Sequence, residues 1–435
     1  NSAQSLLYKE THLGVVMKCR RPHVNLHILI LLMFKNHLIF GLGTSRRSTL
    51  EHLLASALPG TSMWSAMTSP KLYEATNTEV NDLTYITDDT EKYTFDSYPS
   101  FRPYQVFPDA TPTLHPTIKK LSSQSWIHSL SDKSGAIWVG EHHNSAQDHL
   151  LQEQLIRNLY NYRRKNIQNQ PMAIGLEQIQ VKFQPVLDSY LAGKISLQEM
   201  KKQVEWDIRW QWSFEGYSPI FETAKELQIP LIALNVNSED LILVENGGLE
   251  NLSQEQINFY IKDRQGFANF AKSEAFKEYV DYIIRPSYEL HDSMGLLEYS
   301  MSGQKLKQKM PFRNFFSARI LWDEAMASQA FYGWTKTQPR GSLLLGLVGS
   351  DHVKFCNGIT GRYARFGAAC TSVLLNPTWI DTQSSGRILS DTSQQAGDFI
   401  LQLRYRKEDA NPLTEGAAIS TEGGVMPLSD YILLT

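Results

Sequence analysis

Short apolar runs that alternate with long segments of helical period constrain the fold of this chain more than any other feature. Five runs are almost continuous in hydrophobic residues: 136–139, 172–176, 230–234, 343–348 and 372–375. Strands without polar alternation are buried on both faces and therefore need helices on both sides of the sheet. The order of strands and helices predicts an α/β fold with a mainly parallel sheet and helices on both faces.

A long segment without a strand candidate separates the third run from the fourth. Helical patterns fill Gln254 to Tyr299 and Phe312 to Tyr332 within it. The segment is too long for a single crossover between neighbouring strands. We therefore expect a helical insertion at about residues 250–335, which acts as a lid over the edge of the sheet.

The composition along the chain predicts four segments. Residues 1–67 form a targeting presequence, 68–116 a linker and lead-in, 117–376 the α/β domain, and 377–435 a C-terminal β-rich extension. The linker is polar and proline-bearing, without a sustained period. The extension holds two candidate strands, Asp398 to Tyr405 and Asp430 to Leu434.

The first segment has the order of residues that is typical of targeting signals. Basic residues follow Met17 and precede the apolar run 26–34, as in a signal peptide, although a buried helix or mistranslated upstream sequence would give the same pattern. A second signal, the pair Arg46-Arg47 before a stretch with small residues, follows it. Two successive signals resemble the transit peptides of algal plastid proteins. We expect a plastid (chloroplast) location with a further step into the thylakoid lumen.

Charge, cysteine content and hydropathy exclude several classes of protein. The chain carries 42 Lys+Arg against 45 Asp+Glu, a net charge of -3, so it lacks the basic face that nucleic-acid binding needs. Three cysteines exclude a disulfide framework and a four-thiolate zinc site. The longest purely apolar run, Ile28 to Phe34, is far shorter than the roughly 20 residues of a membrane-spanning helix. We expect no stable membrane span in the mature protein.

Polar side chains follow four of the apolar runs. They are Gly140-Glu141-His142-His143-Asn144, Glu177-Gln178, Asn235-Val236-Asn237 and Gly349-Ser350-Asp351-His352. In open α/β sheets the ligand crevice lies outside the carboxyl ends of the strands. The four clusters are therefore predicted to meet in one polar-floored chamber beneath the helical insertion.

Imidazoles and carboxylates at such an edge suit a metal-dependent hydrolase. Glu141, His143 and His352 are candidate ligands of a divalent metal, and Glu141 or Glu177 is the candidate catalytic general base. Two other interpretations stay open. The residues before the helix Gln147 to Lys165 are typical of a helix cap, and Glu177 could form a buried salt bridge.

The helical insertion carries aromatic and basic residues that could contact a flat cofactor. Tyr288 and His291 share one helix face, and Arg285 could meet the carboxylates of such a cofactor. Arg362, in the loop region after His352, could receive an anionic group. The alternatives are an aromatic core stripe and a solvated arginine face.

The ordered motifs of residues 134–366 resemble the ChaN-type haem-binding family, related to the Tiki proteases and erythromycin esterases. The motifs are Gly140-Glu141-His142-His143-Asn144, Asp148-His149-x-x-Gln152, Gly175-Leu176-Glu177, Gln184-x-x-Leu187-Asp188-x-Tyr190-x-x-Gly193, Trp206-x-x-x-Trp210, Tyr217-x-Pro219, Ile232-Ala233-Leu234-Asn235, Trp322-Asp323-x-x-Met326-Ala327 and Gly349-x-x-His352-Val353.

This resemblance implies a haem (tetrapyrrole) ligand, in some members a stacked pair across a homodimer, a tyrosine on the iron and a connection to iron acquisition. Tyr282 and Tyr288 are the candidate tyrosines. The superfamily pattern of two Gly-x-x-His motifs and an acid falls on His143 beside Glu141, on Glu177 and on His352. The leading hypothesis is haem or iron handling in a plastid. The alternatives are the metal-dependent hydrolase and a protein that kept the fold and lost both activities.

Overall fold

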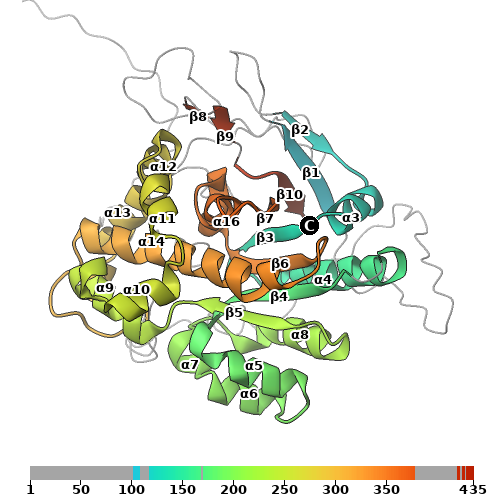
Figure 1. Ribbon diagram of the computed structural model, residues 1–435, viewed down its shortest axis with the longest axis horizontal. Coiled ribbons are helices and arrows are strands. Elements are labelled where there is room, and N and C mark those ends of the chain that lie inside the picture. The colour runs from blue at the N-terminus through green and yellow to red at the C-terminus, as the bar shows by residue number, and fades with distance from the viewer. Residues whose placement is uncertain (1–100, 108–116, 168–169, 378–418, 422–423, 427) are drawn as a thin grey trace, which may run out of the picture. The chain divides into compact units, whose positions relative to one another are not determined.

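The computed structural model describes residues 101–107, 117–167, 170–377, 419–421, 424–426 and 428–435. Its centre is an eight-stranded sheet with the strand order β2-β1-β10-β7-β3-β6-β4-β5 (Figure 1). The strands from β10 to β5 run parallel, and β1 is antiparallel to both of its neighbours. The predicted targeting presequence, residues 1–67, and the candidate strand 398–405 lie outside the described residues.

The strands are bounded as follows: β1 Arg102–Phe107, β2 Thr117–Lys120, β3 Gly135–Glu141, β4 Met172–Gln180, β5 Leu231–Asn235, β6 Leu343–Gly349, β7 Cys370–Leu375, β10 Tyr431–Leu434, and the separate pair β8 Ile419–Thr421 and β9 Gly424–Met426. All seven residues of β3 and of β6, and all nine of β4, are buried. Burial on both faces explains why these segments read as unbroken apolar runs.

Helices connect and cover the strands. They are α3 Ser123–Ser131, α4 Ala146–Asn166, α5 Gln184–Leu191, α6 Leu197–Gln203, α7 Trp206–Arg209, α8 Phe214–Glu226, α9 Ser238–Gly247, α10 Gln254–Tyr260, α11 Arg264–Phe270, α12 Glu274–Tyr279, α13 Arg285–Ser293, α14 Phe312–Ser328, α15 Ser350–Val353 and α16 Ile359–Ala364. No helix among the described residues has the length and hydropathy to span a membrane.

The sheet separates two hydrophobic cores. Successive residues of β6 alternate between them: Leu343, Leu345 and Leu347 pack in the core that α3 to α8 share, whereas Leu344 and Val348 pack in the core of α9 to α16. Side chains of successive strand residues point to opposite faces, which produces this division. The predicted fold class, α/β with a mainly parallel sheet and helices on both faces, is confirmed.

The five predicted strands and the candidate strand 430–434 correspond to β3, β4, β5, β6, β7 and β10. The insertion between β5 and β6 is helical, and its helices α9 to α14 gather beside the sheet in Figure 1. Part of the segment expected as a linker forms β1, because it pairs with β10 from far along the chain. A pairing between segments so far apart in the sequence leaves no periodic pattern in either segment.

Candidate functional site at the carboxyl ends of the strands

Three neighbouring strands deliver polar side chains to one edge of the sheet. Glu141 is the last residue of β3 and lies in register with Gly349, the last residue of β6. Glu177 lies in β4, on the other side of β6, where the pairing with β5 shifts between Leu176 and Gln180. The backbone N–H of Gly349 donates to Glu177 Oε2 at 2.6 Å. Parallel pairing therefore sets the two carboxylates on either side of one glycine.

The first carboxylate, Glu141, is completely buried and accepts several hydrogen bonds on one oxygen. Its Oε1 lies 2.9 Å from His143 Nδ1 and 3.2 Å from Gln178 Nε2, and the hydroxyl of Tyr217 donates to the same oxygen. The other oxygen, Oε2, lies 3.7 Å from His149 Nε2. Glu141 is thus surrounded by donors from β4, α4 and α8.

These neighbours fix the charge of Glu141. Burial by itself raises the pKa of this carboxyl, but the charges of His149 and His143 and the hydrogen bonds outweigh it, so the pKa lies below its ordinary value. Burial, and after it the charge of the same carboxylate, hold the pKa of Tyr217 well above its ordinary value. Tyr217 therefore stays protonated and keeps donating to Glu141.

The second carboxylate, Glu177, belongs to a chain of three buried side chains. His352 Nε2 lies 3.1 Å from Glu177 Oε1, and His352 Nδ1 bonds to Asp323 of α14. All three side chains are fully excluded from solvent. An imidazole between two carboxylates is stabilised as the cation.

The pKa values follow from this arrangement. Burial opposes ionisation of Glu177, but the interactions with His352 and the Gly349 N–H outweigh it and lower its pKa to about 2. Burial and Arg319 oppose protonation of His352, but Glu177 and Asp323 outweigh them and raise its pKa. Both shifts favour a Glu177 carboxylate paired with a His352 imidazolium.

The two pairs are adjacent. A Cβ atom on Gly349 would lie 2.7 Å from His143 Nε2 and 3.6 Å from His352 Cδ2, so both imidazoles lie against this glycine. Glycine is required here because any side chain would displace His143. The predicted meeting of Glu141, His143, Glu177 and His352 is therefore observed.

The side chains do not have the arrangement of the predicted metal site. Both ring nitrogens of His352 lie beside carboxylates, those of Glu177 and Asp323, and Nδ1 of His143 lies beside Glu141. Among the described residues, no group of three or more His, Cys, Asp or Glu side chains could hold a metal ion. The imidazoles instead form hydrogen-bonded pairs with the carboxylates.

The helix-cap interpretation holds for the neighbouring positions. Ser145 caps α4 by accepting from the Asp148 N–H at 3.1 Å. Asp148 in turn accepts from the His142 backbone at 2.9 Å and lies 2.8 Å from His142 Nδ1. His142 is thus part of the cap network, whereas His143, one residue on, faces the sheet edge.

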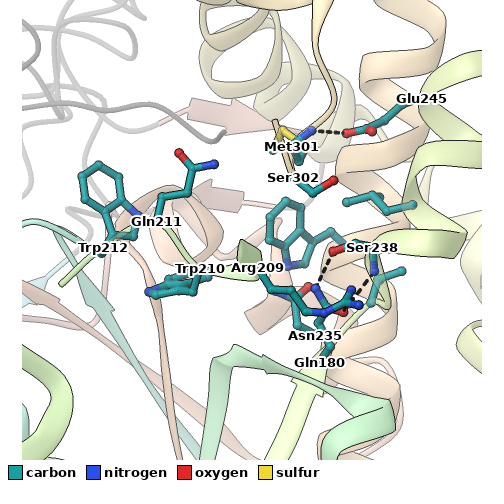
Figure 2. Close-up of a pocket in the computed structure, with 13 residues that line it drawn as sticks. Gln180, Arg209, Trp210, Gln211, Trp212, Asn235, Ser238, Glu245, Met301 and Ser302 are labelled. Carbon is teal, nitrogen blue, oxygen red and sulfur yellow. Dashed lines mark hydrogen bonds between the residues drawn. The ribbon is translucent and has the colours of Figure 1, made fainter. Parts of the chain in front are cut away.

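A pocket opens beside the imidazoles. Figure 2 shows Trp210 and Trp212 on one side of this pocket and Glu245 with Met301 on the other. The ring centre of His143 lies 4.9 Å from that of Trp210 and 5.9 Å from that of Trp212. We call this space, whose lining also includes Trp322, the tryptophan pocket.

The residues predicted to bind a cofactor do not form one group. Arg285 and Tyr288 both contact the ring of Phe312, and Tyr288 and His291 both contact Phe315. Arg285 is exposed, and the Tyr288 hydroxyl donates to the Met310 carbonyl at 3.3 Å. His291 is buried, and burial lowers its pKa. Tyr282 lies in the π-helical segment Val280–Ile284, directly before α13.

Arg362 lies apart from this group. It is completely buried, donates to Glu324 of α14 at 3.1 Å, and its guanidinium stacks on the rings of Phe267, Phe270 and Phe276. Because a buried carboxylate neutralises its charge, Arg362 lies neither on a solvated helix face nor in an open anion site.

Sequence reasoning missed the partners that hold the cluster. Asp323 and Glu324 are buried acids in a largely apolar helix, and such acids require partners: Asp323 bonds to His352 and Glu324 to Arg362. That pattern could have drawn attention to Asp323. Tyr217 stands in the motif Tyr217-x-Pro219, and that motif gives no sign of the role of its hydroxyl.

The comparison with known families decides the relationship of the chain. The family model described as haem-binding uptake, Tiki superfamily, ChaN matches residues 127–362, more than half of the chain. The chain belongs to this family. The family resemblance seen in the sequence is thereby confirmed, and a tetrapyrrole ligand fits the description of this ChaN family.

Solved structures give more distant likenesses. ChaN of Campylobacter jejuni, in a structure titled for cofacial haem binding, is 16% identical with a TM-score of 0.44, covering 76% of this chain and 96% of that one. A mutant of the erythromycin esterase EreC is 13% identical with a TM-score of 0.36, covering 77% and 97%. A Bacillus cereus protein is 13% identical with a TM-score of 0.33, covering 76% and 94%. Curated proteins gave no significant match.

Proposed function

We propose that this protein binds haem or a related tetrapyrrole and takes part in haem or iron handling in a plastid. Membership of the haem-binding uptake family carries the proposal. The two successive targeting patterns in residues 1–67 support the plastid location, and the resemblance supports binding as a homodimer. Haem would bring an iron atom, which a tyrosinate can ligate in the ferric state.

The accessible part of the predicted cofactor group lies along α13. Arg285 is exposed with its guanidinium 4.5 Å from the centre of the Phe312 ring, and the Tyr288 ring packs against the same Phe312. An exposed cation next to aromatic rings suits a flat ligand with carboxylate groups. Tyr282 lies one turn earlier, whereas Arg362 does not fit this role.

Absorbance titration with hemin tests the proposal. We expect a Soret band that saturates at a fixed ratio of hemin to protein, and a weaker or shifted band in Tyr288→Phe or Tyr282→Phe. Tyr162→Phe, on α4, is the matched control and should titrate like the unchanged protein. A Soret region identical to that of free hemin would refute haem binding.

The acid–base cluster supports a second function, hydrolysis, through one specific observation. Two imidazole–carboxylate pairs lie side by side at the strand ends and next to the tryptophan pocket. In the tautomer that carries its proton on Nδ1, His143 donates to Glu141, and Nε2 is then the basic nitrogen that we assign as the proton acceptor. Glu141 would then stabilise the imidazolium that forms. This route replaces the predicted metal ligands by a general base.

A hydrolase assay with a panel of esters and amides tests this second function. We expect His143→Ala and Glu141→Gln to reduce any observed hydrolysis by about 100-fold or more, as is typical for loss of a general base. His128→Ala, on α3, is the control. Hydrolysis that persists in His143→Ala would eliminate the proposed base.

A further inference from the structure

Glu245 is a buried carboxyl that neither proposed function uses. It lies in the last turn of α9 and is 1% exposed. One of its oxygens, Oε1, accepts a hydrogen bond from the Met301 N–H at 2.9 Å. Among the described residues, no Lys, Arg or His forms an ion pair with it. A carboxyl in such a place requires a partner or stays neutral.

Glu245 faces the space where such a partner could bind. It lines the tryptophan pocket and also a smaller pocket beside it, and Met301 and Trp322 line both as well. Figure 2 shows the Glu245 carboxyl reaching toward Met301, with Trp210 and Trp212 farther across the pocket.

The surroundings favour a cation over an anion. The faces of tryptophan rings attract organic cations, and the C-terminal end of a helix carries partial negative charge. The two arginines that line these pockets are already paired: Arg209 with Glu239 and Glu205, and Arg319 with Asp323. Both guanidinium groups therefore pair with carboxylates other than Glu245.

We propose that the tryptophan pocket binds an organic ammonium group, with Glu245 as its counter-ion and the indole rings of Trp210, Trp212 and Trp322 around it. The site lies next to His143 and His352, whose rings contact the lining tryptophans. The proposed ammonium site is independent of both haem binding and hydrolysis. The proposal states that the part of a ligand bound in this pocket is positively charged.

Proton release accompanies binding in this arrangement. Burial raises the pKa of Glu245 to about 8, so most of the carboxyl is protonated at pH 7. A bound ammonium group favours the ionised form, and the carboxyl gives up its proton. The other titratable or charged groups nearby are Arg209 and Arg319 in the lining and the imidazoles of His143 and His352 behind the tryptophans.

Calorimetry and tryptophan fluorescence with three probes of one shape test the site. The full chain is titrated with benzylammonium, benzyl alcohol and benzoate at pH 7. We expect saturable binding of benzylammonium, and a binding heat that changes between buffers of different ionisation enthalpy because protons are released. Stronger binding of benzoate, equal binding of benzyl alcohol, or no saturable binding of benzylammonium would overturn the proposal.

Variants localise the effect. Glu245→Gln keeps an oxygen for the Met301 N–H, so its thermal unfolding should match that of the unchanged protein, while benzylammonium binds at least about 10-fold more weakly and without proton release. Glu250→Gln, an exposed acid paired with Arg313, is the matched control. Should Glu245→Gln fail to fold, the buffer dependence of the unchanged protein decides alone: no proton release refutes Glu245 as the counter-ion.

Discussion

Replacement of Glu177 by Gln should cost the protein about 3 kcal/mol of unfolding free energy at pH 7. The pKa of Glu177 lies at about 2, against 4.5 in the absence of its neighbours. At about 1.4 kcal/mol for each pH unit, that difference corresponds to roughly 3 kcal/mol. Removal of one partner of a buried ion pair typically costs about 3–5 kcal/mol, which agrees with this figure. The glutamine oxygen can still accept from the Gly349 N–H.

The pH dependence identifies the cause. A carboxyl whose pKa is lowered by folding contributes stability that is fully present above pH 4.5 and is lost as the pH falls toward 2. The difference between the unchanged protein and Glu177→Gln should therefore shrink between pH 4.5 and pH 2. His352 has a raised pKa, so its contribution is present below pH 6.5 and lost as the pH rises through its folded pKa.

Urea unfolding followed by tryptophan fluorescence, at intervals from pH 3 to pH 8, measures both effects. Glu255→Gln, at an exposed position of α10, is the control and should change the free energy by less than about 0.5 kcal/mol. A loss below 1 kcal/mol at pH 7, or a difference that stays constant across the acid range, would refute the charged Glu177–His352 pair.

Three further substitutions test other parts of the structure. Arg163→Met should destabilise by about 3 kcal/mol in urea unfolding, because the buried guanidinium donates to carbonyls in three separate connections, at Ser131 and Lys133, at Gln170 and at Gly341. Unchanged stability would refute this role. Tyr217→Phe removes a donor to Glu141, so we expect the free energy of unfolding to fall by about 1–2 kcal/mol and the pKa of Glu141 to rise. The acid limb of any hydrolytic pH profile should then move to higher pH. An acid limb at the same pH would count against the Tyr217–Glu141 hydrogen bond. Gly349→Ala should displace His143 and cost about 1–3 kcal/mol, and a crystal structure with His143 in place would contradict it.

The sheet was predictable because each central strand is buried on both faces. Continuous apolar runs identify such strands. Parallel pairing then brings their carboxyl ends together, so the sequence predicts that Glu141 and Glu177 share one site. The strands β1 and β2, at one end of the sheet, were not predictable. β2 has only four residues, two of them lysines, and β1 pairs with β10 from far along the chain.

The roles of individual side chains were harder to predict than their positions. The sequence placed His352 at the sheet edge, but the bond to Asp323 depends on how α14 crosses the sheet, which only tertiary packing determines. The same holds for Arg362, whose carboxylate partner lies 38 residues earlier in the sequence. A stripe of residues on one helix, such as Tyr288 and His291, does not reveal which neighbour will cover it.

The position of β10 has a consequence for biosynthesis. This strand lies between β1 and β7, yet it is synthesised after every other member of the eight-stranded sheet. Until it leaves the ribosome, β1 with β2 has no partner in the sheet and one edge of β7 stays open. Unpaired strand edges promote aggregation, and late long-range pairing slows folding. We expect the nascent chain to depend on chaperones until residues 431–434 close the gap.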